Sequence, residues 1–350
     1  MSAVLFRQHG GPEVLEWAEV DRPEPRRDQV LVRVEACGIN HLDLWTRRGL
    51  PGREIPLPHI LGNEPVGVVE ALGPDAGADW PANRSPLAEG QRVLVAPGYL
   101  DRFHADRSGW DALLPDYRVI GHQSPGGYGQ YVVARAENLV PVSDRLAPHE
   151  WAATPLTFLT AWHMLMGRAR VKAGETVLVM AGGSGVGTAA IQIARWAGCR
   201  VFATAGSETK LARSRELGAE EAFDHAAVLP WEKEVRRASG GGVDVVVEHV
   251  GEAVFSRAVT ALRSGGRIVT CGATTGPAAK LNLTHLFAKQ LSLLGSYMGD
   301  FTELLEVVAH LEAGHFRPVV DRTLPVREAA EAHRLLEERQ VFGKLVLTHE

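Results

Sequence analysis

A glycine-rich turn near the middle of the chain constrains the fold more than any other feature. It reads Ala181-Gly182-Gly183-Ser184-Gly185-Val186-Gly187 and lies between a short apolar run, 176–180, and a segment with helical spacing, 188–197. In this strand–turn–helix setting, glycines let the backbone approach a pyrophosphate, and the helix N-terminus offers it free N–H groups. Ser184 replaces the middle glycine of the G-x-G-x-x-G pattern. The alternative is a purely structural turn. We predict a dinucleotide site that contains Gly182, Ser184, Gly185, Val186 and Gly187.

Short strands and helices alternate around this turn. Runs typical of buried strands occupy 200–204, 243–248 and 267–271, and helical spacing occupies 210–217 and 255–262. Such alternation predicts a parallel sheet with helices on both faces, as in dinucleotide-binding domains. We assign this α/β domain to residues 149–295 and expect it to begin with a helix over 149–166.

The N-terminal part of the chain has a different pattern, with short strands separated by turn residues. Examples are 30–34, 66–71, 92–96 and 130–134, each bounded by Gly, Pro, Asp or Asn. We predict a barrel-like domain with little helix, in which 97–129 is one long irregular segment. The C-terminal part is expected to contain helices at 301–312 and 327–339 and strands at 322–324 and 343–347. Residues 1–148 and 296–350 are therefore assigned to one discontinuous domain, into which the α/β domain is inserted.

Composition argues against several classes of partner. The chain has 37 Lys and Arg against 42 Asp and Glu, a formal net charge of −5, so nucleic-acid binding is not favoured. Its three cysteines form no paired motif, which is typical of a reducing, cytoplasmic setting. We read no signal peptide and no apolar run long enough to span a membrane. A small-molecule substrate is expected, with no nucleic-acid or membrane partner.

The end of the second strand of the α/β domain bears on the choice of cofactor. Domains that bind NAD usually place an acidic residue there, about 20 residues after the turn, to hold the ribose 2′-hydroxyl. Ser207 occupies that place here, and Lys210 follows one helical turn later. A hydroxyl and an ammonium suit a 2′-phosphate, so we predict NADPH. NADH is the alternative if Glu208 reaches the ribose. If Ser207 and Lys210 do not bind a cofactor, they lie in an exposed loop and on a solvated helix face.

Several motifs, in this order, give the chain a resemblance to a known family. They are GGPEVL (10–15), ACGINHLD (36–43), LGNEPVGVV (61–69), PLTFLTAW (155–162), GGRIVTCG (265–272) and GKLVL (343–347). Over nearly its whole length the chain resembles the medium-chain dehydrogenase/reductase superfamily. The branches nearest in pattern are the zinc alcohol dehydrogenases and the zinc-free quinone oxidoreductases of the ζ-crystallin type. The resemblance implies a GroES-like β-barrel catalytic domain and a Rossmann domain.

The same resemblance identifies the positions at which zinc-bearing members hold their catalytic metal. These positions are Asn40, Asn63 and Leu156 here, and none supplies the thiolate, imidazole or carboxylate that zinc prefers. We therefore predict no bound metal. A divergent site made by Asp43, Glu64 and His59 is the alternative, and Glu64 otherwise caps backbone or binds an arginine. The segment 97–129 corresponds to the family's structural-zinc lobe, yet it contains no cysteine.

Without a metal, the chemistry is limited to substrates that need little electrophilic help. The cofactor carries the hydride, and a quinone or α,β-unsaturated carbonyl spreads the developing charge onto an oxygen that a neutral donor can stabilise. The candidate catalytic residues are Asn40, Asn63 and Thr157. The alternative is that each asparagine is a turn residue bonded to its own backbone and that Thr157 packs within its helix. The resemblance adds to the cofactor site Gly272, Ala273, Phe342 and Lys344. The alternative interpretation of Lys344 is a solvated charge.

Two further functions and one assembly are considered. The first alternative function is that of an alcohol dehydrogenase or carbonyl reductase with a divergent or absent metal site. The second is that of a non-catalytic NADPH-binding protein. The β-prone run 290–297 corresponds to a strand that pairs between subunits in the family, and an exposed apolar edge would otherwise promote aggregation. We predict a homodimer or a dimer-based tetramer.

Overall fold

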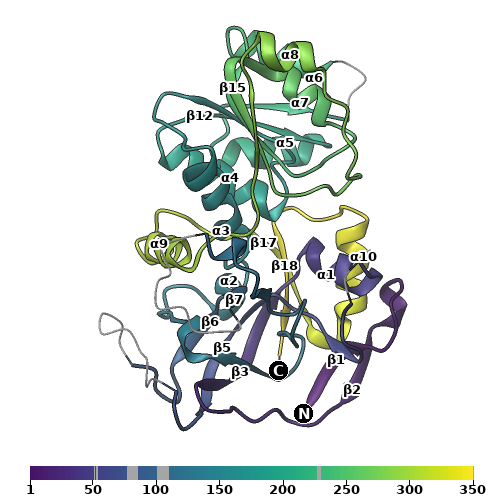
Figure 1. Ribbon diagram of the computed structural model, residues 1–350, viewed down its shortest axis with the longest axis vertical. Coiled ribbons are helices and arrows are strands. Elements are labelled where there is room, and N and C mark those ends of the chain that lie inside the picture. The colour runs from purple at the N-terminus through teal and green to yellow at the C-terminus, as the bar shows by residue number, and fades with distance from the viewer. Residues whose placement is uncertain (51, 53, 77–85, 101–109, 227–229, 350) are drawn as a thin grey trace. The chain divides into compact units, whose positions relative to one another are not determined.

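The computed structural model describes residues 1–350 except 51, 53, 77–85, 101–109, 227–229 and 350. The chain forms two compact units (Figure 1). The first contains Met1–Leu156, Asp300–Glu312 and Pro318–Glu350, and the second contains Thr157–Gly299 and Ala313–Arg317. The predicted boundaries, 148/149 and 295/296, therefore lie a few residues before the observed divisions at 156/157 and 299/300. The short segment Ala313–Arg317 also packs with the second unit.

The first unit is built mainly from β-strands, most of which belong to two sheets. One has the order β2-β1-β4, and the other has the order β10-β6-β5-β3-β18-β17, with β9 also paired to β3. The strands are β1 Ser2–Phe6, β2 Glu16–Glu19, β3 Gln29–Gly38, β4 His59–Ile60, β5 Glu64–Leu72, β6 Arg92–Val95, β9 Tyr131–Arg135, β10 Leu139–Pro141, β17 Val320–Pro325 and β18 Lys344–Thr348. Val30, Val32 and Val34 of β3 belong to one buried core cluster, whereas Arg33 is exposed.

In the N-terminal part, one short helix was not predicted, and the expectation of a wholly irregular segment 97–129 is wrong. A helix, α1 His41–Arg48, follows β3 directly, because Asn40 is extended at its N-cap and the Asp43 carboxylate accepts the Asn40 N–H at 2.7 Å. The segment 97–129 is not wholly irregular, because β7 Gly98–Leu100 pairs antiparallel with β8 Tyr117–Val119. Residues 101–109 of that segment lie outside the described residues.

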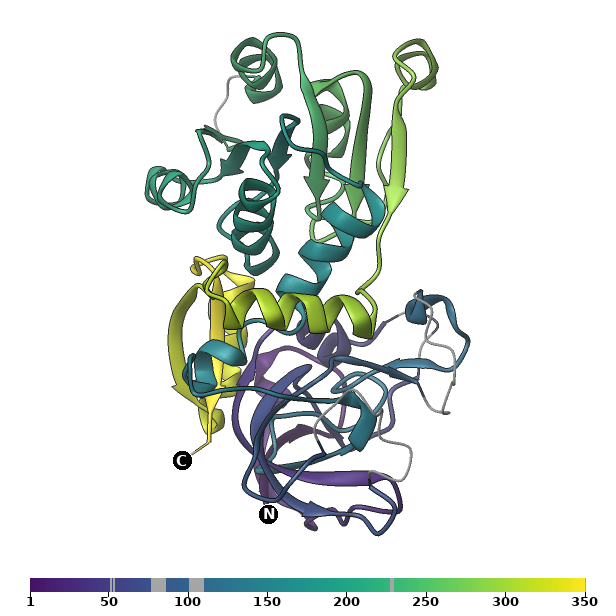
Figure 2. The same cartoon turned by 90° about the vertical axis from the view of Figure 1, so that its left-hand side faces the viewer.

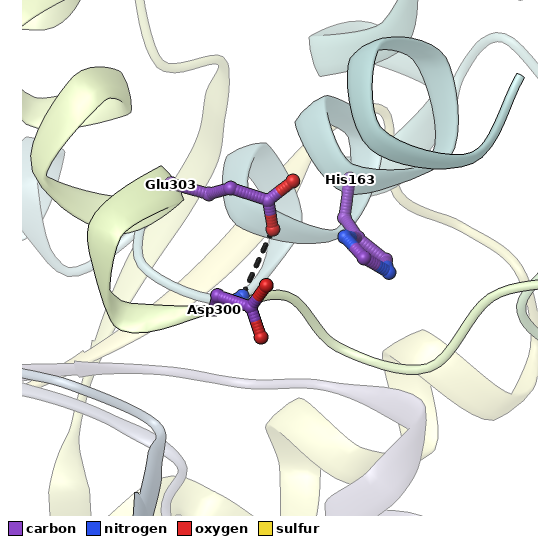
Figure 3. A group of neighbouring side chains, drawn as sticks. All are labelled: His163, Asp300 and Glu303. Carbon is purple, nitrogen blue, oxygen red and sulfur yellow. Dashed lines mark hydrogen bonds between the residues drawn. The ribbon is translucent and has the colours of Figure 1, made fainter. Parts of the chain in front are cut away.

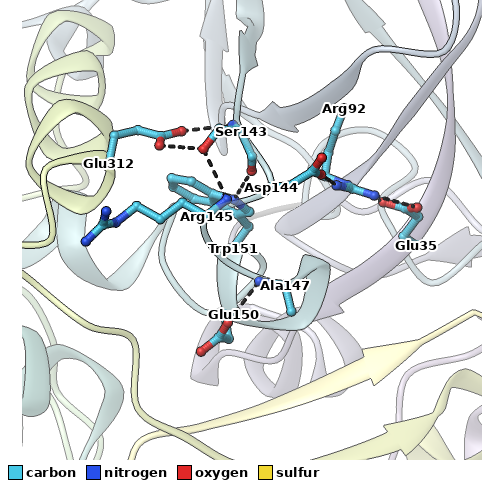
Figure 4. Close-up of polar contacts among 9 residues, drawn as sticks. All are labelled: Glu35, Arg92, Ser143, Asp144, Arg145, Ala147, Glu150, Trp151 and Glu312. Atoms are coloured by element: carbon cyan, nitrogen blue, oxygen red, sulfur yellow. Dashed lines mark hydrogen bonds and ion pairs between the residues drawn. The ribbon is translucent and has the colours of Figure 1, made fainter.

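The remaining helices of the first unit are α2 Pro148–Trp151, α9 Phe301–Glu312 and α10 Ala329–Glu337, with 3-10 turns η1 Pro12–Val14, η2 Asp111–Leu113, η3 Ala136–Asn138 and η5 Val326–Glu328. Glu303 Oε2 accepts the Asp300 N–H at 2.9 Å and so caps the start of α9 (Figure 3). The other end of α9 is tied down by Ser143, whose hydroxyl donates to Glu312 Oε2 at 2.6 Å (Figure 4). The Ser143 carbonyl in turn accepts from Trp151 Nε1 at 3.0 Å, which links α9 to α2.

The second unit contains the predicted parallel sheet, in the order β13-β12-β11-β14-β15-β16. Its strands are β11 Thr176–Val179, β12 Arg200–Ala205, β13 Glu221–Asp224, β14 Val243–Glu248, β15 Leu262–Thr270 and β16 Ser292–Gly295. Its helices are α3 Thr157–Trp162, α4 Gly185–Trp196, α5 Glu208–Glu216, α6 Trp231–Ala238, α7 Phe255–Ala261 and α8 Leu283–Ala288, with a π-helical turn η4 His163–Arg168. Helices flank the sheet (Figure 2). Strand order reverses direction between β11 and β14, and ligands bind at such switch points.

The predicted helix over 149–166 is broken in the structure. α2 ends at Trp151, and α3 begins only at Thr157. Pro155 explains the gap, because a proline has no N–H and disfavours helical backbone in the residue before it. β13, α6 and α8 were not predicted. Within the described part of the chain, no helix combines the length and apolar character needed to cross a bilayer.

Candidate functional site

The glycine-rich turn follows β11 and is held against β12. Gly182 N–H donates to the Thr204 carbonyl at 2.7 Å, and Ala181 N–H donates to Thr204 Oγ1 at 3.1 Å. A side chain at Gly187 would place its Cβ 2.4 Å from the Ala181 carbonyl oxygen. Only glycine therefore allows α4 to start this close to the strand.

Ser184 directs its side chain into the start of α4. Its Oγ accepts the Gly187 N–H at 2.9 Å and lies 3.1 Å from Nε2 of His249, the residue that follows β14. Burial lowers the pKa of His249 to about 4, so the imidazole is neutral at pH 7. Among the described residues, the N–H groups of Gly185 and Val186 have no intramolecular acceptor. Free N–H groups at a helix N-terminus suit a pyrophosphate, so the turn fits the predicted dinucleotide.

The carboxyl ends of β14 and β15 lie at the same edge of the sheet. Glu248 is buried, and its Oε1 accepts N–H bonds from Val250 at 2.6 Å and Gly251 at 2.8 Å. Burial raises the pKa of this carboxyl. Gly272 packs closely here, because a Cβ would be 3.1 Å from the His249 carbonyl oxygen. Gly272 and the following Ala273 thus lie beside His249, which the sequence did not single out.

The carboxyl end of β12 has no carboxylate in the expected place. Ser207 Oγ caps α5 by accepting the Lys210 N–H at 3.4 Å, and Glu208 is exposed. His225, which follows β13, lies beside this strand end: its Nδ1 is 3.0 Å from Thr204 Oγ1. Its Nε2 would be 3.3 Å from a Cβ at Gly206. The imidazole of His225 is therefore a second candidate ligand for a cofactor ribose, missed because it is remote in sequence.

In the first unit, Lys344 is the centre of a buried polar cluster. Its side chain is only 4% exposed, which excludes the interpretation as a solvated charge. Nζ donates to Glu64 Oε2 at 2.6 Å, to Asn40 Oδ1 at 2.7 Å and to the Ile39 carbonyl at 2.6 Å. We call Lys344, Glu64 and Asn40 the Lys344 cluster.

Both carboxylates near Asn40 are occupied by donors of the chain itself. Glu64 Oε1 accepts the Leu156 N–H at 2.7 Å, and Glu64 Oε2 accepts from Asn40 Nδ2 at 2.9 Å. Glu64 thus accepts a backbone N–H, as one alternative predicted, but its ion-pair partner is Lys344 and not an arginine. Asp43 Oδ1 accepts the Gly62 N–H at 3.0 Å, and burial raises the pKa of Asp43 to about 7.

The other predicted site residues of this region, and His59, lie as follows. Asn63 is buried and donates from Nδ2 to the Ile120 carbonyl at 2.7 Å, while its Oδ1 has no hydrogen-bond partner within the described residues. Thr157 is buried at the start of α3 in the second unit, and Phe342 is buried just before β18. His59 Nε2 lies 3.1 Å from the Gly121 carbonyl, and His59 is not grouped with other potential ligands among the described residues.

Known proteins resemble the chain along almost its entire length. Residues 26–144 match the alcohol dehydrogenase GroES-like domain family, and residues 185–313 match the zinc-binding dehydrogenase family. The quinone oxidoreductase of Homo sapiens is 30% identical over 355 residues, covering 99% of this chain and 97% of the human protein. This chain belongs to the medium-chain dehydrogenase/reductase superfamily.

Solved structures of this superfamily share the fold. A protein described as an NAD-dependent alcohol dehydrogenase is 46% identical, with a TM-score of 0.93 and coverage of 99% of both chains. The 2-octenoyl-CoA carboxylase reductase CinF, solved with NADP and 2-octenoyl-CoA, is 26% identical, with a TM-score of 0.88 and coverage of 99% of this chain and 87% of CinF. The predicted combination of a GroES-like domain with a Rossmann domain is confirmed, and the chain is an oxidoreductase.

The residues of this medium-chain dehydrogenase/reductase do not suit a catalytic zinc ion. Asn40 Oδ1 already binds the Lys344 ammonium, which would repel a dication at that oxygen. Leu156 has no donor atom in its side chain, and Asn63 offers one amide oxygen. Zinc normally requires thiolate, imidazole or carboxylate ligands, so this donor set does not fit it.

Proposed function

We propose that this enzyme transfers a hydride from NADPH to a quinone or an α,β-unsaturated carbonyl compound without a catalytic metal. The observation that carries the proposal is the Lys344 cluster, in which Asn40 binds an ammonium at a position where zinc-bearing members hold their metal. The quinone oxidoreductases and the 2-octenoyl-CoA reductase among the similar proteins support this substrate class.

The chemistry follows from the groups that remain. NADPH, when bound, supplies the hydride to the conjugated carbon, and the electron pair of the C=C bond moves toward the carbonyl oxygen. Asn40 Nδ2 carries two hydrogens, of which Glu64 Oε2 accepts one, so the other can be donated to that oxygen. The proton that completes the reduction comes from water. A neutral donor is sufficient because conjugation already disperses the negative charge.

NADPH is the proposed cofactor because cationic or neutral donors surround the end of β12. Ser207, Lys210 and His225 lie at this strand end or on the helix that follows, whereas the exposed Glu208 carboxylate is 3.6 Å from Arg215. The structure solved as an NAD-dependent alcohol dehydrogenase makes NADH the alternative. Comparison of kcat/KM for NADPH and NADH with one acceptor decides between them.

Oxidation of alcohols is the second candidate function, and the 46% identity to a protein described as an alcohol dehydrogenase favours it. The deciding experiment measures NADPH oxidation with 1,4-benzoquinone, 9,10-phenanthrenequinone, a short 2-alkenal and simple ketones, on protein whose metal content is known. Turnover of a quinone or enal with less than about 0.1 zinc per chain supports the proposal. Stoichiometric zinc together with alcohol or ketone turnover refutes it, and NADPH binding without turnover of any quinone or enal contradicts the proposed substrate class.

We also propose a homodimer, or a tetramer made of dimers, assembled through the β16 edge of the sheet. β16 is the last strand in the sheet order, and large apolar side chains are exposed on it and near it. They are Leu283 (66%), Phe287 (69%), Leu293 (39%) and Tyr297 (46%). An uncovered apolar strand edge is an aggregation hazard, so a second copy of the chain is the proposed cover. No nucleic-acid or membrane partner is proposed, and the three unpaired cysteines suit a cytoplasmic location.

A further inference from the structure

The Lys344 cluster determines which way the Asn40 amide faces. The oxygen and nitrogen of an asparagine amide have nearly the same shape, so their hydrogen-bond partners decide the orientation. Lys344 Nζ can only donate and therefore takes Oδ1, at 2.7 Å. Glu64 Oε2 can only accept and therefore takes Nδ2, at 2.9 Å. A cation and an anion on opposite sides of the amide allow one orientation only.

The backbone around Asn40 is held by Lys344 and by a further carboxylate, that of Asp43. The Ile39 carbonyl accepts from Lys344, and the Asn40 N–H donates to Asp43 Oδ2. Glu64 is anchored independently by the Leu156 N–H. The cluster is almost completely shielded from water, because Lys344 is 4% and Glu64 0% exposed. In such a low-dielectric environment, charged hydrogen bonds are strong and rigid.

We propose that Lys344 and Glu64 are positioning residues that present the second Nδ2–H of Asn40 to the substrate oxygen, and that the Lys344 ammonium strengthens this N–H as a donor. The ammonium at Oδ1 draws electron density from the amide, which makes the N–H group more positive. This inference rests on the proposed function, since it assigns Asn40 as the donor to the developing enolate or hydroquinone oxygen. It assigns to Lys344 a role exerted through Asn40.

The test compares variants that remove the charges singly and together. Lys344→Met leaves Glu64 buried without its cation, so it is accompanied by the double variant K344M/E64M, which removes both members of the ion pair. Lys344→Arg keeps the cation. Lys289→Met is the matched control, because Lys289 is a partly buried lysine of the second unit that donates only weakly, at 3.4 Å, to the Leu262 carbonyl. Thermal unfolding and NADPH titration by fluorescence establish that each variant folds and binds cofactor.

The expected result is a loss in kcat of about tenfold or more for K344M/E64M, since full removal of an oxyanion donor costs about 100-fold or more in known enzymes. The KM for the enal or quinone should change by less than about threefold, because the donor acts mainly as charge develops in the transition state. K344R should keep a higher kcat than K344M, and K289M should have the wild-type kcat. A general loss of structure would instead weaken NADPH binding.

Two results would overturn the inference. One is a folded K344M/E64M variant that binds NADPH and keeps kcat within about twofold of wild type. The other is a loss confined to KM for NADPH, which would make Lys344 a cofactor ligand only. Failure of the proposed function is distinguishable from both, because wild-type protein would then turn over none of the quinones or enals.

Discussion

The hydrogen bonds around His333 lead to a specific prediction about stability and pH. Arg47 is fully buried, and its Nη1 donates to His333 Nδ1 at 2.9 Å. A guanidinium cannot accept, so Nδ1 must carry a lone pair, and the single ring proton lies on Nε2, 3.0 Å from Tyr128 Oη. Arg47 also pairs with Glu337 and donates to the Gly10 carbonyl. The geometry therefore requires a neutral imidazole.

The magnitude follows from the displaced pKa of this imidazole. Burial, with smaller contributions from the cations of Arg47 and Arg48, lowers the pKa of His333 from 6.5 to about 3. Between pH 6.5 and about pH 3, His333 is protonated in the unfolded chain and neutral in the folded chain. The associated stability is fully present above pH 6.5 and is lost as the pH falls toward 3. From pH 7 to pH 5 the loss is about 2 kcal/mol, at about 1.4 kcal/mol for each pH unit well below 6.5.

His333→Gln removes this titration, and urea unfolding at pH 7 and pH 5 measures the effect. The variant is less stable than wild type at pH 7, because glutamine does not reproduce both hydrogen bonds. The difference between the two proteins should shrink by about 2 kcal/mol at pH 5. Tyr128→Phe is the matched control: it removes the hydroxyl, leaves Arg47 at Nδ1 and should keep the wild-type pH dependence. Equal pH dependence in wild type and His333→Gln would refute the reasoning.

Three further predictions concern the second unit. Ser184→Ala removes the α4 N-cap and should lower stability by about 1 kcal/mol in thermal unfolding, with the NADPH Kd within about threefold of wild type; a Kd raised tenfold or more would show that the hydroxyl itself contacts cofactor. Lys210→Ala should reduce kcat/KM for NADPH about tenfold in steady-state assays and leave NADH unaffected, whereas equal losses would contradict a role at the 2′-phosphate. Phe287→Lys places a charge in the exposed apolar surface near β16 and should give monomers in light scattering; an unchanged oligomer would exclude this edge as the interface.

Local patterns in the sequence were sufficient for most of the second unit. The strand predicted at 243–248 has those bounds in the structure, because all six residues are buried and most are valines, which favour strands. In the first unit, the helix predicted over 301–312 also has the predicted bounds. α1 could have been predicted, since Asn40, Asp43 and Gly49 are ordinary helix start and stop signals.

Local sequence patterns predicted the chemistry of the site only in part. The turn at 181–187 and the absence of zinc ligands at Asn40, Asn63 and Leu156 can be read from residue types at fixed spacing. Residue types alone also made Lys344 a candidate, but they left open whether its charge was solvated or paired. Local spacing reports what a residue can bond within its own helix, strand or turn.

Tertiary structure decided which charges meet. β18 pairs antiparallel with β3, and β3 pairs with β5, so Lys344 comes to Glu64 across 280 positions of the chain. The packing of α1 and α10 likewise brings Arg47 to His333. Each ion or hydrogen-bond pair is buried, and burial is what makes its partner obligatory, because an unpaired charge away from water is strongly destabilising. The sequence by itself determined two domains and the glycine-rich turn between β11 and α4. Sheet pairing and burial made Lys344, Glu64 and Asn40 a single cluster.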